Sequence, residues 1–143
     1  MTNATAAVNA LMLDYAWAVH DFQQLARSLS LLATAIGADD FEDRNFYADV
    51  ELLTMDMAPE TARHAAVVRG LTADDKAVLV RLKQARDKLV YSFFLDCRLD
   101  RPGADDMVAQ AQARLTAIRD DVKKGHAVLD RAYALVAEAG EDD

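Results

Sequence analysis

Residues 5–36 read TAAVNALMLDYAWAVHDFQQLARSLSLLATAI, and the spacing of their apolar side chains decides the fold. Apolar residues recur alternately three and four positions apart, at Val8, Leu11, Tyr15, Ala18, Phe22, Leu25, Leu29, Leu32 and Ile36. This alternation places side chains along one face of an α-helix. The face is widened, as is typical of a bundle helix, by Met12, Val19, Ala26 and Ala33. We therefore predict one long helix over residues 5–36, ended by Gly37.

The same alternation returns in the last part of the chain, at Val108, Ala111, Leu115, Ile118, Val122, Gly125, Leu129, Ala132 and Val136. It predicts a second long helix over residues 104–138. Gly125 lies on the apolar face of this helix, where it allows a close helix approach or marks a kink.

A third helix is predicted over residues 72–99. Its apolar face consists of Val78, Leu82, Ala85, Leu89 and Phe93. Thr72 and Asp75 have the spacing of a capping box at its start. The turn Arg101-Pro102-Gly103 follows its end. Short connections between long helices favour antiparallel neighbours.

The composition supports a single domain spanning residues 1–143. Only 5 glycines and 2 prolines are present, too few for the frequent turns of a strand-rich fold. We predict an all-α protein, an antiparallel four-helix bundle. No apolar run approaches the length of a membrane span, and the N-terminal residues lack the basic stretch of a signal peptide. Cys97 has no partner for an intrachain disulfide, so a cytoplasmic location is expected.

Residues 39–60 differ from the rest because they contain eight acidic residues and a single basic one, Arg44. A short helix is expected over about 43–55, and a second helical piece begins near Pro59, so the bundle carries an extra short helix or loop around 43–60. The acidic segment is either a solvated connection or a docking surface for a basic protein partner. The second alternative would make the chain a non-enzymatic adaptor or inhibitor.

Within the third helix, residues 86–94 read RDKLVYSFF. This run resembles the signature of HEPN domains, the higher eukaryotes and prokaryotes nucleotide-binding family. The signature is an arginine, usually followed by a polar residue, with a histidine four to six intervening residues after the arginine. Here these positions hold Arg86, Asp87 and Tyr91, so the motif is degenerate at the histidine. Many bacterial members end the run with an aromatic pair, as Phe93-Phe94 does.

The resemblance implies a specific chemistry. Active HEPN members are metal-independent ribonucleases, often toxins or defence effectors, and they dimerise so that two motifs face one cleft. In that scheme Arg86 would hold the scissile phosphate, Asp87 would orient it, and the residue at position 91 would be the general acid or base. An ordinary phenol titrates near pH 10 and is a poor base at neutral pH. The resemblance therefore implies RNA or nucleotide binding in a defence or toxin–antitoxin setting, with weak or no cleavage.

A second apolar side of the third helix has its own consequence. At 100° per residue, Tyr91 and Phe94 fall away from the main apolar face, with Val90 at the edge. Either the first and last helices cover this side, or a second copy of the chain does. The second alternative predicts a homodimer interface at Val90, Tyr91 and Phe94.

Metal and cofactor sites are not predicted. His20, His64 and His126 lack the Glu-x-x-His spacing of di-metal bundles and are expected to be isolated surface residues. One cysteine excludes a thiolate-rich zinc site. The basic residues of the third helix alternate with acidic ones, which is typical of a solvated face.

Overall fold

The structure, a computed structural model, describes residues 2–37, 45–55, 59, 61–96 and 104–141. The described residues fold almost entirely into helices, so the predicted all-α helical bundle is confirmed. Helix α1 spans Thr2–Ala35, α2 spans Phe46–Thr54, α3 spans Ala62–Gly70 and α4 spans Ala73–Asp87. A π-helical turn, η1, covers Lys88–Ser92, and α5 (Phe93–Asp96) and α6 (Ala104–Glu141) follow.

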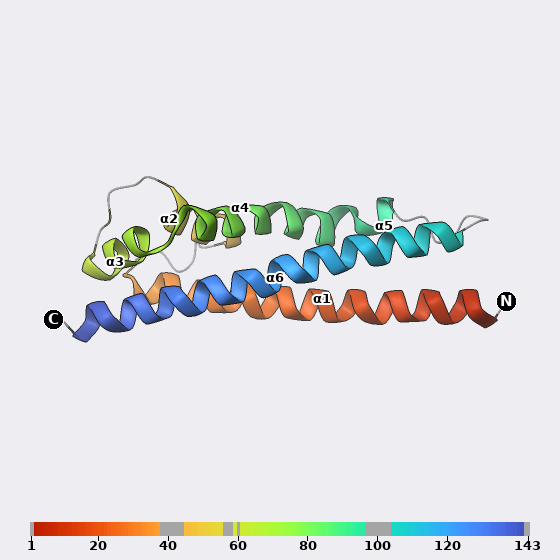
Figure 1. The fold of residues 1–143 in the computed structure, drawn as a ribbon, viewed down its shortest axis with the longest axis horizontal. Coiled ribbons are helices and arrows are strands. Elements are labelled where there is room, and N and C mark those ends of the chain that lie inside the picture. Colours follow the sequence, from red (N-terminus) through yellow and green to blue (C-terminus); the bar gives the residue numbers. More distant parts are fainter. Residues whose placement is uncertain (1, 38–44, 56–58, 60, 97–103, 142–143) are drawn as a thin grey trace.

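Three long helical rods make up the bundle, and they are α1, the continuous rod α4–η1–α5, and α6 (Figure 1). The rod α4–η1–α5 runs opposite to both of its neighbours, so α1 and α6 point in the same direction. Four main helices were expected. Instead, three long rods are present. The short helix predicted over about 43–55 and the helical piece predicted after Pro59 correspond to α2 and α3, which have 9 residues each and lie at one end of the bundle.

The core forms along the predicted apolar faces of α1 and α6. On α1, Leu11, Leu25 and Leu32 have at most 1% of their surface exposed, and on α6 Leu115 and Leu129 have at most 2%. Each fully buried aliphatic side chain of this size contributes roughly 1.5–3 kcal/mol by leaving water. Regular alternation of three and four along both sequences therefore predicted the two longest helices and their main buried positions correctly. Met12, which was expected to widen the apolar face of α1, is instead 49% exposed.

Local signals mark the helix ends as expected. The Thr72 side chain accepts the Asp75 backbone N–H, and the Asp75 carboxylate accepts the Thr72 N–H, which is the predicted capping box at the start of α4. Gly37 follows α1 with a φ of 88°, a left-handed conformation that glycine adopts without steric cost. Thr61, the residue before α3, donates its hydroxyl to the Ile36 carbonyl 2.7 Å away and so ties α3 to the end of α1.

Candidate functional site

The guanidinium of Arg86 lies between two tyrosine rings. Arg86 is in the last turn of α4, and its guanidinium carbon is 5.1 Å from the centre of the Tyr47 ring and 5.8 Å from that of Tyr91. Both distances are within cation–π range. The residue is half-buried, whereas Tyr91 has 63% of its surface exposed. One face of this arrangement therefore remains open to solvent.

Asp87 holds the Tyr47 ring in place. The Tyr47 hydroxyl donates a hydrogen bond to the Asp87 carboxylate, which raises the pKa of Tyr47 because the bond favours the protonated phenol. The neighbouring Tyr47 hydroxyl in turn raises the pKa of Arg86, whose guanidinium is charged at neutral pH in any environment. The predicted orienting residue Asp87 thus acts on the ring that covers Arg86.

Tyr91 lies within the π-helical turn η1. Residues 88–92 widen the helix immediately after Arg86 and Asp87, and π-turns of this kind are frequent at functional sites. The Tyr15 hydroxyl of α1 donates to the Leu89 carbonyl at 2.7 Å inside this turn. The Leu89 carbonyl in this turn therefore has a hydrogen-bond donor on α1.

Phe94 packs inside the bundle more than the interface prediction expected. Its ring centre is 4.8 Å from that of Tyr15 and 5.0 Å from that of Phe93, and the side chain is half-buried. The exposed apolar residues in this region are Val90 (50%), Tyr91 (63%) and Leu95 (75%). We call these three residues the η1–α5 patch.

A hollow of about 390 Å³ lies on the other side of Arg86. Its apolar lining comes from α1 and η1, including Val19 and Leu89, and from Phe46 at the start of α2. Gln23 and Asn45 add amide groups to the wall. The cavity is within the size range of small-ligand sites and joins an apolar surface to a fixed cation.

The structure therefore brings the predicted Arg86, Asp87 and Tyr91 together around one additional residue, Tyr47. Neither Tyr47 nor Leu95 was singled out from the sequence. Tyr47 lies 40 positions before Asp87, and only the packing of α2 against α4 brings the two into contact. A Glu51–Lys83 ion pair at 3.5 Å lies along the same contact between α2 and α4.

The acidic segment is only partly described. Asp39, Asp40, Glu42, Asp43, Asp56 and Glu60 lie outside the described residues. Of the two that are described, Asp49 is 3% exposed and Glu51 pairs with Lys83. Neither offers a free carboxylate to a basic partner, so docking through residues 39–60 stays a prediction without support from the described part.

One expectation about the histidines was wrong. His64 was predicted to be a surface residue, but it is 3% exposed, and its Nε2 lies 2.9 Å from the Leu52 carbonyl oxygen. Leu52 lies in α2, so this contact joins two helices, and helical spacing within α3 alone does not reveal it. Among the described residues, no three histidine, cysteine or acidic side chains come close enough to hold a metal ion. Nor is any helix in the described ranges long and apolar enough to cross a membrane.

Comparison with known proteins adds no relative: the chain matches no protein-family model, no curated protein and no solved structure. The resemblance to HEPN domains therefore depends on the motif at residues 86–94. The geometry of Tyr47, Arg86 and Tyr91 is independent of that resemblance.

Proposed function

We propose that this chain is a HEPN-like helical protein that acts as a cytoplasmic homodimer and binds RNA or a nucleotide at Arg86. The observation that carries the proposal is the Arg86 guanidinium between the Tyr47 and Tyr91 rings, beside an apolar hollow. By this proposal the protein belongs to a defence or toxin–antitoxin system and has little or no ribonuclease activity.

The chemistry of the three side chains suits a single-stranded nucleic acid. A guanidinium presents a planar fork of donors that matches a phosphate, and the two rings restrict its orientation before the ligand arrives. The exposed Tyr91 ring offers a stacking surface for a base, which is worth about 1–3 kcal/mol in comparable sites. In the hollow, the Gln23 amide and the side-chain NH2 of Asn45 can bond to base edges, while the Asn45 amide oxygen already accepts the Ala48 N–H at the start of α2.

Fast cleavage is not part of the proposal because the motif lacks its histidine. At neutral pH the Tyr91 phenol supplies a hydrogen bond or a stacking face and no general base. Asp87, the other ionisable residue of the motif, already accepts the Tyr47 hydroxyl.

The homodimer is supported by the η1–α5 patch. Val90, Tyr91 and Leu95 are at least half exposed and adjoin the motif. A stable interface buries about 800 Å² per subunit, so Val90 and Leu95 would form only part of it, and Tyr91 would lie at its edge beside the shared cleft, where its ring stays accessible to a base. Pairing there would bring two Arg86 side chains toward a shared cleft, as the resemblance implies.

Fluorescence anisotropy with a labelled single-stranded RNA tests the binding proposal. We expect Arg86→Ala to weaken binding at least about ten-fold, and Arg86→Lys to weaken it less, because lysine keeps the charge but loses the planar fork. Arg27→Ala is the matched control, since Arg27 is an exposed arginine on α1 outside this site. Circular dichroism would verify that each variant keeps its fold. Equal losses in Arg86→Ala and Arg27→Ala, or no RNA binding by the unchanged protein, would overturn the proposal.

A second assay addresses catalysis. The unchanged protein and Tyr91→His are incubated with total RNA in the presence of a metal chelator. We expect the unchanged protein to leave the RNA intact and Tyr91→His to cleave it slowly, because the histidine restores a base that titrates near neutrality. If neither protein cleaves RNA, the enzyme interpretation of the motif is removed and binding alone remains.

A further inference from the structure

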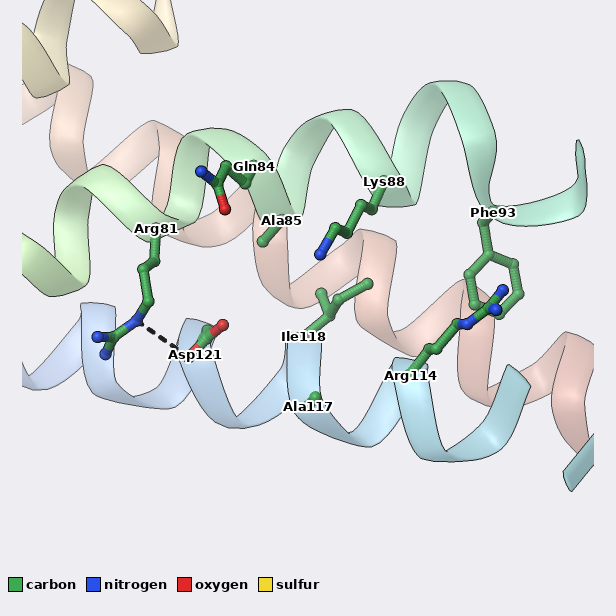
Figure 2. Close-up of a pocket in the computed structure, with 9 residues that line it drawn as sticks. All are labelled: Arg81, Gln84, Ala85, Lys88, Phe93, Arg114, Ala117, Ile118 and Asp121. Atoms are coloured by element: carbon green, nitrogen blue, oxygen red, sulfur yellow. Dashed lines mark ion pairs between the residues drawn. The ribbon is translucent and has the colours of Figure 1, made fainter. Parts of the chain in front are cut away.

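A cavity of about 470 Å³ separates the rod α4–η1 from α6, on the side of α4 that faces α6 (Figure 2). Its floor is apolar and consists of Ala85, Phe93 and Ile118, each at most 5% exposed. Arg86 is not among its lining residues, because that side chain is directed to Tyr47 of α2. The cavity is therefore separate from the site described above.

Positive charge gathers at the rim of this cavity. Arg81 lies at one end, Arg114 at the other, and Lys88 points from η1 toward α6 between them (Figure 2). Among the described residues of the lining, Asp121 is the one acidic side chain, and it pairs with Arg81 at 3.8 Å. Within the described part of the chain, Lys88 and Arg114 form no ion pair.

The positive charge at this rim is opposite in sign to the net charge of the molecule. The whole chain has a formal net charge of −8, yet three cations here meet one carboxylate over an apolar floor. Cations that face each other across a partly apolar space repel, and an anion placed between them relieves that repulsion. An inorganic anion alone would leave the floor uncovered, while an apolar molecule alone would leave Lys88 and Arg114 without a counter-charge.

We propose that this cavity binds a small amphipathic organic anion. Its apolar body would lie on Ala85, Phe93 and Ile118, and its sulfonate or phosphate head would be held by Lys88 and Arg114. The volume is in the range of sites for small organic ligands. Asp121 competes with the ligand for Arg81, so it lowers the affinity.

The test uses three probes on the whole chain. Anilinonaphthalene sulfonate carries both an apolar body and an anionic head, N-phenyl-1-naphthylamine carries the body alone, and sodium phosphate supplies the head alone. We expect saturable fluorescence enhancement with the sulfonate probe, at least ten-fold weaker binding of the neutral probe, and displacement by phosphate only at much higher concentration. Equal binding of the charged and neutral probes would overturn the proposal.

Variants decide whether the probe occupies this cavity. Lys88→Gln and Arg114→Gln should each raise the Kd of the sulfonate probe about three- to ten-fold. Ala117→Trp, at an exposed position on the cavity wall, should block binding without disturbing the core. The matched control is Lys124→Gln, which removes an exposed lysine of α6 outside the cavity. If Lys88→Gln and Arg114→Gln bind the probe as the control does, the proposal is wrong.

Asp121→Asn gives a change of opposite sign. It frees Arg81 from its ion pair and removes the carboxylate that the described lining contains, so the Kd should fall about three-fold. Weaker binding in this variant would contradict the proposed role of the three cations. Arg86→Ala should leave probe binding unchanged, which keeps this result distinguishable from the RNA-binding test.

Discussion

At the scale of single residues, Gly125 shows how closely α6 approaches the other two rods. A Cβ atom built on Gly125 would lie 2.6 Å from a Leu82 methyl of α4 and 3.2 Å from a Leu25 methyl of α1. Both leucines are at most 1% exposed, so neither has free space into which to move. Of the two alternatives that the sequence left open, a close approach and a kink, this contact supports the close approach.

Gly125→Ala should therefore destabilise the protein. Replacing a helical glycine by alanine gains about 0.5–1 kcal/mol in helix propensity, whereas overpacking a core costs about 1–3 kcal/mol. We expect a net loss of about 1–2 kcal/mol in the free energy of unfolding, measured by urea denaturation. Gly140→Ala is the control, since its nearest neighbour is the flexible Arg63 guanidinium at 3.3 Å. A Gly125→Ala variant as stable as Gly140→Ala would mean that the rods are not in close contact there.

Single residues also show where sequence reasoning stops. Thr72 and Asp75 are three positions apart, so their capping box depends on local geometry and was predicted correctly. Tyr47 reaches Arg86 only because α2 packs on α4, and no local sequence pattern predicts that contact. The prediction that His64 is a surface residue was wrong for the same reason, because its partner Leu52 lies in α2.

At the scale of elements, η1 is the feature that the apolar spacing did not predict. Leu82, Leu89 and Phe93 keep intervals that an ordinary α-helix would also satisfy, so the extra backbone width at residues 88–92 leaves no trace in the pattern. The aromatic residues in and after η1 lie on two sides of the rod. Phe93 and Phe94 turn toward Tyr15 of α1, while Tyr91 stays exposed beside Arg86.

The start of α4 contributes a pH-dependent part of the stability. Asp75 accepts hydrogen bonds from the Arg131 guanidinium of α6 and from the Thr72 N–H. The hydrogen bond from Arg131 is the main reason why the pKa of Asp75 is lowered. A carboxyl whose pKa is lower in the folded state stabilises the fold above its unfolded pKa, near 3.9. That contribution is lost as the pH falls through the folded value.

Asp75→Asn should accordingly lower the free energy of unfolding by about 1 kcal/mol at pH 7, since the Arg131 side chain is 54% exposed and its ion pair is screened by water. Urea midpoints measured from pH 7 down to pH 2.5 should show the difference from the unchanged protein shrinking below about pH 4. Asp74→Asn, in the same turn, controls for the helix dipole. A deficit that stays constant down to pH 2.5 would show that Asp75 acts through its shape and not through its charge.

At the scale of the whole molecule, two properties oppose each other in the proposed homodimer. The η1–α5 patch favours association, because Val90 and Leu95 leave water when they are covered. Two chains of formal charge −8 repel each other at low ionic strength. The Debye length falls from about 10 Å at 0.1 M salt to about 3 Å at 1 M, so salt removes the repulsion and leaves the apolar attraction.

Dimerisation and RNA binding should therefore respond to salt in opposite directions. Sedimentation velocity at 0.05 M and 0.5 M NaCl should show tighter dimers at the higher salt, whereas RNA affinity should fall because bound counterions are no longer released as favourably. Leu95→Glu places a charge in the η1–α5 patch and should yield monomers at both salt concentrations. Leu31→Glu makes the same change at a 52% exposed residue of α1 and should dimerise normally. If the unchanged protein stays monomeric at 0.5 M NaCl, the η1–α5 patch is excluded as the interface. Equal loss of dimers in Leu95→Glu and Leu31→Glu would exclude it as well.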